Sequence, residues 1–283
     1  MTPNVFDNRQ CSLGEGPLWH PERKQLFWFD INNKKMLSRS DEEIHAWQFG
    51  QHVSAAGWIN RDELLIASEI ELFRFNVETS DHQHLCDLEA EEPETRSNDG
   101  RADPWGGFWI GTMGKQAEPE AGAIYRYYQG ALEVLFQDIT IPNAICFSPD
   151  RKYAYYTDTP TRLIMRQDLK ADGWPTGAAE VFVDLNDEGT NPDGAVVDAE
   201  GCLWVAQWGA SRMARYSPRG TLLSTVGLDA QQVTCPAFGG PSFSTLFATS
   251  AYEGMTNPNE AQGRTYSVQL GNISGQPEHR VIV

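Results

Sequence analysis

Short apolar and aromatic runs recur along the chain, and turn-forming residues separate them. Six such runs stand at residues 26–29, 64–66, 108–110, 153–156, 203–205 and 246–248. Several are followed by a stretch in which polar and apolar residues alternate, as at 72–75, 123–127 and 212–216. Short runs rich in β-branched and aromatic residues are typical of β-strands. No apolar period of about 3.6 residues persists for three turns, so the pattern predicts an all-β chain.

An internal repeat indicates how these strands are arranged. Six segments share a small or polar residue, here called the anchor, then a short apolar run and a turn centred six positions after the anchor. The anchors are Glu15, Ala55, Asn98, Asn143, Asp193 and Cys235. Their spacings are 40, 43, 45, 50 and 42 residues, with a mean of 44, as expected of four-stranded propeller blades. The sequence therefore predicts a six-bladed β-propeller with a central channel.

A propeller of this kind must close its ring. We expect residues 4–9 to complete the last blade beside either residues 264–270 or residues 280–283, because closure hides strand edges that otherwise aggregate. No linker rich in proline or serine interrupts the chain, and no shift in composition divides it. We therefore expect a single domain over residues 1–283.

Equivalent anchors begin equivalent strands, so the predicted fold brings them to the same end of the channel. Four of them carry side-chain oxygens: Glu15, Asn98, Asn143 and Asp193. Carboxylate and amide oxygens are ligands of hard divalent cations such as Ca²⁺, Mg²⁺ and Mn²⁺. The alternative is that each residue only caps its own turn, as such residues beside glycine commonly do. Independent turn caps have no reason to share one repeat position, which favours a metal-binding channel.

Charge and composition narrow the classes of partner and compartment. The chain has 22 Lys+Arg and 39 Asp+Glu, which gives a formal net charge of −17. This negative charge argues against nucleic acid or an anionic membrane as a partner. The N-terminal sequence lacks a basic segment followed by an apolar run, and no stretch approaches the ~20 apolar residues that span a bilayer. We therefore expect a cytoplasmic protein. The five cysteines are widely spread without a CxxC pair, which predicts reduced thiols.

Four long segments of the chain resemble one enzyme family, the SMP-30/gluconolactonase/regucalcin-like sugar lactonases. They read SLGEGPLWHPERKQLFWFDI at 12–31, RSNDGRADPWGGFWIGTMG at 96–114, IPNAICFSPDRKYAYYTDT at 141–159 and NPDGAVVDAEGCLWVAQWG at 191–209. They stand in the family's order, and the resemblance extends over nearly the whole chain. It implies a six-bladed propeller that binds one divalent metal in its channel and hydrolyses lactones of sugar acids.

The resemblance also implies roles for individual residues. By position, Glu15, Asn143 and Asp193 are the expected metal ligands, for one divalent cation that is Ca²⁺, Mg²⁺, Mn²⁺ or Zn²⁺. Arg96 and Asn98 are the expected substrate contacts, and Arg96 is the one residue of this set that the repeat does not select. Asp193 is also the expected catalytic residue, because a carboxylate that holds the metal through one oxygen can accept a proton from water through the other.

One departure from the family concerns the charge of the substrate. Regucalcin-type members carry acidic residues just after the second segment, whereas residues 114–116 here read Gly-Lys-Gln. We therefore expect Lys115 to bind substrate, with the second anionic group of an aldarolactone as its partner; alternatively, Lys115 extends into solvent. Asp99 is a second candidate base, although strand alternation predicts that it points away from the channel. His52 lies three residues before the second anchor and is a further candidate for a functional residue.

The expected function is metal-dependent hydrolysis of a small sugar-acid lactone to the open-chain acid. The substrate is an aldonolactone such as glucono-1,5-lactone, or an anionic aldarolactone. Motifs of serine hydrolases, zinc proteases and phosphate-binding loops are missing from the sequence. Two alternatives stay open: another hydrolase of the phosphotriesterase or arylesterase kind on the same scaffold, and a propeller that binds calcium without catalysis.

Overall fold

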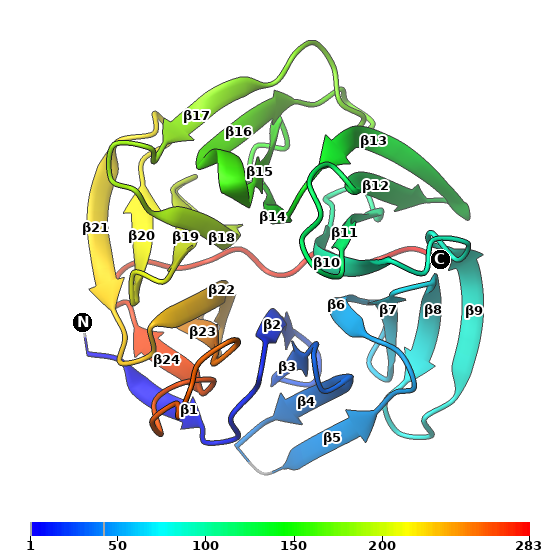
Figure 1. The fold of residues 1–283 in the computed structure, drawn as a ribbon, viewed down its shortest axis with the longest axis horizontal. Helices are drawn as coiled ribbons and strands as arrows, with labels where there is room; N and C mark the ends of the chain where they lie inside the picture. The colour runs from blue at the N-terminus through cyan, green and yellow to red at the C-terminus, as the bar shows by residue number, and fades with distance from the viewer. Residues whose placement is uncertain (1, 42) are drawn as a thin grey trace.

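Six antiparallel sheets of four strands each surround a central axis (Figure 1). The computed structural model describes residues 2–41 and 43–283, and within them one short 3-10 helix, Thr159–Thr161, accompanies the strands. The all-β six-bladed propeller predicted from the repeat is confirmed. The predicted domain, residues 1–283, also includes residues 1 and 42, which lie outside the described residues, and its extent stays a prediction.

The strands nearest the axis begin each blade, and a second strand follows each of them in sequence. The innermost strands are β2 (Gly14–His20), β6 (Val53–Trp58), β10 (Thr95–Ala102), β14 (Pro142–Phe147), β18 (Asn191–Val197) and β22 (Gln232–Gly239). The second strands are β3 (Gln25–Asp30), β7 (Glu63–Ser68), β11 (Phe108–Gly114), β15 (Tyr153–Asp158), β19 (Leu203–Trp208) and β23 (Thr245–Ala251).

Third and outermost strands complete the blades. The third strands are β4 (Lys35–Arg39), β8 (Glu71–Asn76), β12 (Gly122–Tyr128), β16 (Leu163–Asp168), β20 (Arg212–Tyr216) and β24 (Thr265–Gln269). The outermost strands are β5 (Ile44–Gln48), β9 (His82–Asp87), β13 (Ala131–Ile139), β17 (Glu180–Asp184), β21 (Leu222–Gly227) and β1 (Asn4–Asp7). Strand β1 pairs with β24, so the N-terminal segment closes the ring in the first of the two predicted ways.

The core lies between the blades, which explains the apolar runs seen in the sequence. Every residue of β3 and of β11 is buried. Phe27, Trp109 and Trp204 occupy corresponding places in three second strands and are each 0% exposed. Because neighbouring blades cover both faces of a second strand, its sequence is apolar almost without interruption.

Each innermost strand is bulged at its anchor. The pairing register shifts between Glu15 and Leu18, Val53 and Ala55, Ser97 and Gly100, Asn143 and Cys146, Pro192 and Ala195, and Val233 and Pro236. A bulge bends a strand and changes the direction of its side chains. The same bulge repeated six times gives the anchors a common orientation relative to the axis.

Glycines beside two anchors allow neighbouring blades to approach closely. A Cβ atom on Gly16, whose φ is +55°, would lie 2.2 Å from Ser54 O in the next blade. A Cβ atom on Gly194 would lie 2.3 Å from Cys235 Sγ. These glycines therefore serve contacts between blades, rather than only the local turns that an anchor followed by glycine indicates.

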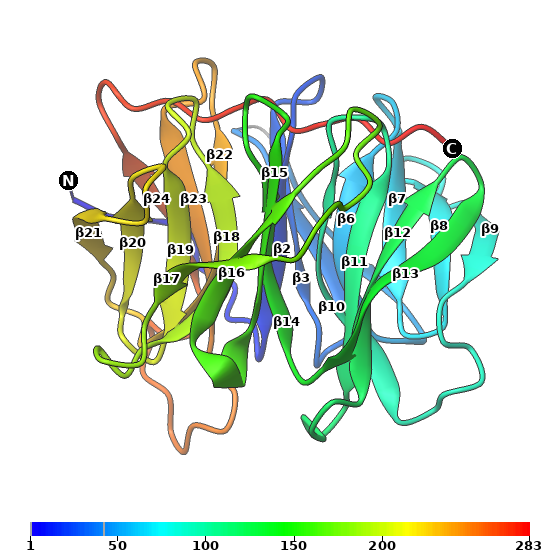
Figure 2. The ribbon, with the colours of Figure 1, turned by 90° about the horizontal axis from the view of Figure 1, so that it is seen from above.

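The C-terminal segment, residues 275–283, crosses one face of the ring (Figure 1) and runs along the upper edge in Figure 2. Gln276 donates to Val197 O at 3.1 Å, and Val281 N donates to Trp58 O at 2.9 Å. Between these contacts Glu278 forms an ion pair with Arg101, which extends from the end of an innermost strand. The segment therefore covers the end of the axis where the innermost strands finish.

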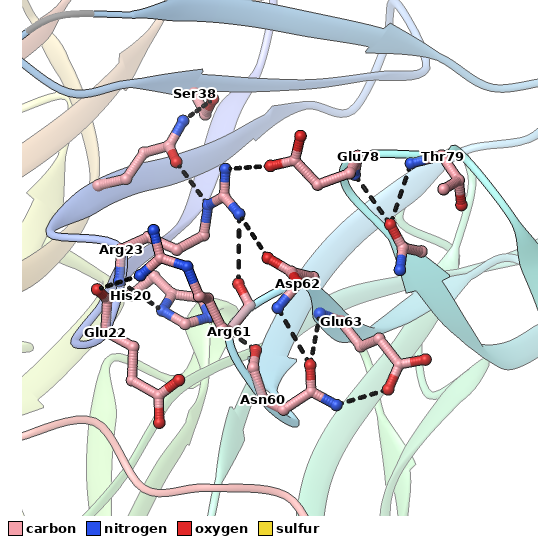
Figure 3. Close-up of polar contacts among 12 residues, drawn as sticks. His20, Glu22, Arg23, Ser38, Asn60, Arg61, Asp62, Glu63, Glu78 and Thr79 are labelled. Atoms are coloured by element: carbon pink, nitrogen blue, oxygen red, sulfur yellow. Dashed lines mark hydrogen bonds and ion pairs between the residues drawn. The ribbon is translucent and has the colours of Figure 1, made fainter.

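A cluster of polar residues joins the first two blades near the turns that follow β2 and β6 (Figure 3). Arg23 donates through Nε to Gln25 at 2.9 Å, and its Nη1 and Nη2 contact Asp62 at 3.0 Å and Glu78 at 2.6 Å. We call these four residues the blade clasp. Its guanidinium is engaged on every nitrogen, which is the pattern of a structural contact.

Two further predictions bear on the chain as a whole. The five cysteines are free thiols, as the sequence predicted. Within the described residues, the structure contains no helix with the length and apolar character needed to traverse a lipid bilayer.

Candidate active site

A cavity of about 400 Å³ opens at the end of the axis where the innermost strands begin. All six residues predicted from the sequence line this one cavity: Glu15, Arg96, Asn98, Lys115, Asn143 and Asp193. They come from four blades and are separated by up to 178 positions in the chain. The fold therefore brings the predicted site residues together, while their roles in binding and catalysis stay predictions.

Two buried carboxylates, Glu15 and Asp193, lie on the cavity wall. They are 6% and 5% exposed, and among the described residues no arginine, lysine or histidine forms an ion pair with either of them. Burial, followed by repulsion from Asp99, raises the pKa of Glu15, while burial and repulsion from Glu15 raise the pKa of Asp193. Attraction from Arg96 lowers the pKa of Glu15, but burial outweighs it. Ionising both buried carboxylates is unfavourable, and a bound divalent cation would offset that cost.

An amide oxygen completes this donor set. Asn143 donates through Nδ2 to Thr159 Oγ1 at 3.0 Å, and Thr159 Oγ1 donates to Pro192 O at 2.9 Å. These bonds fix the orientation of the amide, whose oxygen accepts a hydrogen bond from Asn98 Nδ2 at 3.2 Å. Two carboxylates and an amide oxygen suit a hard divalent cation, so the residues present fit the metal that the sequence predicted.

Arg96 presents unused hydrogen-bond donors to the cavity. Its Nη1 donates to Ser97 O at 2.9 Å and to Asn98 Oδ1 at 2.8 Å. In the part of the chain that the structure describes, its Nε and Nη2 have no partner, so they are available to a ligand. Asn98 differs, because its Nδ2 already donates to Pro142 O at 3.0 Å and to Asn143 Oδ1 at 3.2 Å. Asn98 thus links the arginine to the predicted metal ligand.

Lys115 lines the cavity but does not extend freely into it or into solvent. Its Nζ lies 2.5 Å from Glu69 Oε2 and 2.6 Å from Pro93 O, and its side chain is 29% exposed. Glu69 also accepts hydrogen bonds from His52, through Nδ1 at 3.2 Å and the backbone N at 3.1 Å. His52, held open by the sequence, therefore supports the partner of Lys115.

Sequence reasoning missed a second ring of cavity residues. Thr159, Trp208 and Glu253 line the cavity together with Lys115. Each of these four lies at the end of its second strand or within two residues after it. Alignment of the repeats at the second strands, rather than only at the anchors, is the signal that would have found them.

Asp99 lies behind the cavity wall rather than on it. It is 4% exposed, and its Oδ2 accepts a hydrogen bond from Ile145 N of the next blade at 2.7 Å. Burial raises its pKa to about 6. Its direction agrees with strand alternation, and its contact satisfies a backbone group between two blades.

A separate acidic cluster lies in the turn after β18. Ligand atoms of Asp198, Glu200 and Cys202 all lie within 4.8 Å of one another. Arg215, however, donates to Asp198 Oδ2 at 2.9 Å and to Glu200 Oε2 at 2.6 Å. Both carboxylates of this cluster are thus paired with an arginine, which distinguishes them from the carboxylates of the cavity.

Comparisons with known proteins agree with this architecture. The model of the SMP-30/gluconolactonase/LRE-like region matches residues 13–252. A protein of Rhizobium meliloti (strain 1021), provisionally named a sugar lactone lactonase, is 42% identical over 270 residues, which cover 91% of this chain and 90% of the relative. The 6-deoxy-6-sulfogluconolactonase of Pseudomonas putida is 32% identical over 249 residues, with 85% and 84% covered. The solved structure of a calcium-binding protein, regucalcin from Agrobacterium tumefaciens str. C58, has a TM-score of 0.97 and 37% identity, and the match covers 100% of this chain and 98% of that one.

Proposed function

This chain belongs to the SMP-30/gluconolactonase/LRE-like family, and we propose that it hydrolyses sugar-acid lactones with one divalent cation held by Glu15, Asn143 and Asp193. One observation carries the proposal. Within the described residues, the cavity combines two buried carboxylates that form no ion pair with an arginine whose Nε and Nη2 have no protein partner. The first feature favours a cation, and the second favours an oxygen-rich ligand beside it.

The cavity suits a small polyol ring. Its volume of about 400 Å³ is in the range of small-molecule sites. The planar fork of Arg96 can bond two neighbouring oxygens of a sugar, which a lysine in its place cannot. Trp208 and Met113 supply apolar wall area for the C–H face of the ring. A lactone of a six-carbon aldonic acid, such as glucono-1,5-lactone, is the substrate we propose.

The chemistry is the addition of water to a cyclic ester. A bound divalent cation supplies charge stabilisation for the oxygen of the carbonyl as that oxygen becomes negative. Asp193 accepts a proton from the attacking water, whose oxygen forms the new bond to the carbonyl carbon. The bond between that carbon and the ring oxygen then breaks, and the ring oxygen takes up a proton to become a hydroxyl. Arg96 holds the lactone in line for this attack.

Two further functions remain outcomes of the same experiment. The regucalcin relative is called a calcium-binding protein, so a propeller that binds calcium without catalysis is one of them. A phosphotriesterase or arylesterase is the other, because one scaffold hosts several hydrolytic activities. The free donors of Arg96 favour an oxygen-rich substrate over a bare cation site.

The decisive experiment measures acid release by a pH indicator on metal-depleted protein. The protein is reloaded in turn with Ca²⁺, Mg²⁺, Mn²⁺ and Zn²⁺ and assayed with aldonolactones, aldarolactones, a phosphotriester and an aryl ester. We expect hydrolysis of aldonolactones that depends on the added metal. Equal rates before and after depletion would contradict the metal-dependent mechanism, and turnover of the phosphotriester alone would replace the proposed substrate class.

A further inference from the structure

We propose that Glu69 cancels the charge of Lys115 at the cavity wall and so makes the site select uncharged sugar lactones over anionic ones. The inference rests on the proposed function, because it concerns the substrate of the same cavity. Glu69 lies outside the cavity lining and acts through Lys115, so it is a positioning residue.

The two side chains come from the same end of the second strands in neighbouring blades. Glu69 directly follows β7, and Lys115 directly follows β11. Their side chains are 11% and 29% exposed, and Oε2 and Nζ are 2.5 Å apart. A close pair with little solvent around it is weakly screened, so the carboxylate offsets most of the lysine charge toward a ligand.

Glu69 is also held in place from behind. Oε1 accepts the backbone N–H of His52 at 3.1 Å, and Oε2 accepts Nδ1 of His52 at 3.2 Å. With both oxygens anchored, the carboxylate cannot turn away when a ligand enters. The lysine is restrained as well, because Pro93 O accepts a second of its hydrogens at 2.6 Å.

The remaining capacity of Lys115 suits a neutral group. An ammonium has three hydrogens to donate, and two have protein acceptors here. The third has no acceptor among the residues that the structure describes and is available to a sugar hydroxyl. Apart from the two buried carboxylates and Lys115, the charged residues of the cavity wall are Arg96, which is positive, and Glu253, which is negative. The rim therefore presents hydrogen-bond donors without a surplus positive charge for a carboxylate or sulfonate on the far end of a substrate.

The test compares four variants by their selectivity. These are E69Q, K115Q, the double variant E69Q/K115Q, and E71Q as a matched control. Glu71 belongs to the same blade, and it pairs with His82 and His84 instead of the cavity lysine. E71Q thus makes the same change in net charge away from the site. Selectivity is the ratio of kcat/KM for glucaro-1,4-lactone, an anion, to kcat/KM for glucono-1,5-lactone.

E69Q should raise this ratio about tenfold, which corresponds to ~1.4 kcal/mol of attraction between the unpaired Lys115 ammonium and the anionic substrate. K115Q should lower the ratio, because it leaves Glu69 facing the ligand. The double variant should return to within about twofold of the wild-type ratio, since the pair is neutral with or without its charges. E71Q should leave the ratio unchanged. Equal ratios in E69Q and E71Q, or a wild-type protein that prefers the anion and loses that preference in the double variant, would overturn the proposal.

A binding measurement separates this inference from the proposed function. Calorimetric titration of the metal-loaded protein with gluconate and with glucarate gives the same ratio without turnover. Suppose that wild type hydrolyses no lactone but E69Q still raises the affinity for glucarate relative to that for gluconate. The proposed function is then wrong, and the charge cancellation stands. If wild type hydrolyses lactones but E69Q and E71Q give equal ratios in both measurements, the charge cancellation is wrong and the proposed function stands. Should E69Q alone fail to fold, as judged by thermal unfolding, equality of wild type and the double variant still supports the proposal, and a lower ratio in the double variant overturns it.

Discussion

Two arginines in different parts of the ring show how one residue type is used for structure and for binding. In the blade clasp, Arg23 bonds through all its nitrogens to Gln25, Asp62 and Glu78 (Figure 3). In the cavity, Arg96 uses only Nη1 for protein contacts and leaves Nε and Nη2 without a partner in the described residues. The clasp is complete as it stands, whereas the cavity is arranged for something further to bind.

The carboxylates of the two regions differ in the same way. Asp62 and Glu78 have side chains that are 47% and 59% exposed, so water solvates them and their pairing with arginine adds little stability. Glu15 and Asp193 are buried, and neither forms an ion pair with any of the residues that the structure describes. Burying such groups lowers stability, and a protein tolerates that where function requires it. The comparison predicts that changes in the clasp leave activity intact and lower stability by about 1 kcal/mol or less, while changes in the cavity alter activity.

The largest effect is expected from Asp193→Asn. In the proposed mechanism Asp193 is a charged metal ligand that also accepts the water's proton, so its loss should reduce kcat/KM for glucono-1,5-lactone by roughly a thousandfold. Asp62→Asn in the clasp is the matched control, and it should stay within about threefold of wild type. Similar losses in both variants would erase the distinction between the two regions.

A smaller effect on activity is expected from Arg96→Lys. Lysine keeps the charge but loses the planar fork, so kcat/KM should fall by about ten- to a hundredfold. Arg23→Lys should leave the kinetics unchanged and lower the free energy of unfolding by about 1 kcal/mol, measured by chemical denaturation. A strong kinetic defect in Arg23→Lys would show that the clasp acts on the cavity.

Metal removal should lower the stability of the wild-type protein only. Chelation leaves two repelling carboxylates buried, so the thermal midpoint should fall by about 2–4 °C for each 1 kcal/mol lost. Asp193→Asn removes one of these carboxylates, so its metal-free form should be more stable than metal-free wild type by ~1 kcal/mol. Differential scanning calorimetry with and without chelator checks both statements. A chelator response in Asp193→Asn as large as that of wild type would place the cation elsewhere.

The smallest effect concerns the stability contributed by the Glu69–Lys115 ion pair at acid pH. Burial raises the pKa of Glu69, but hydrogen bonds from Lys115 and His52 outweigh it and lower the pKa to about 2 from its ordinary value of 4.5. A lowered pKa means that the stability from this carboxylate is complete above pH 4.5 and is lost as the pH falls through 2. The pKa of His52, which burial lowers and Glu69 raises, lies below its usual 6.5. The difference in unfolding free energy between wild type and E69Q should therefore be constant from pH 7 to 8 and shrink below 4.5. A difference that already changes between pH 7 and 8 would contradict this assignment.

The site residues divide by how the sequence could find them. Glu15, Asn98, Asn143 and Asp193 were selected by repeat register, because six equivalent bulges orient equivalent positions alike. Arg96 came from the family resemblance, since it lies off the anchor position. Thr159, Trp208 and Glu253 lie at or just after the ends of second strands, whereas the anchors lie in the innermost strands. Their roles, like those of the predicted ligands, await the experiments above.

What the sequence by itself determined is the ring: its all-β character, its six blades and the end of the axis where four oxygen-bearing anchors meet. Periodicity carries this information, because a repeated unit fixes what is equivalent around a closed ring. What only the tertiary structure decided is how side chains from different blades pair. The contact between Lys115 and Glu69, and that between Arg101 and Glu278, join residues 46 and 177 positions apart. Such pairs depend on the spacing and twist of neighbouring blades and on the path of the C-terminal segment, which no period along the chain records.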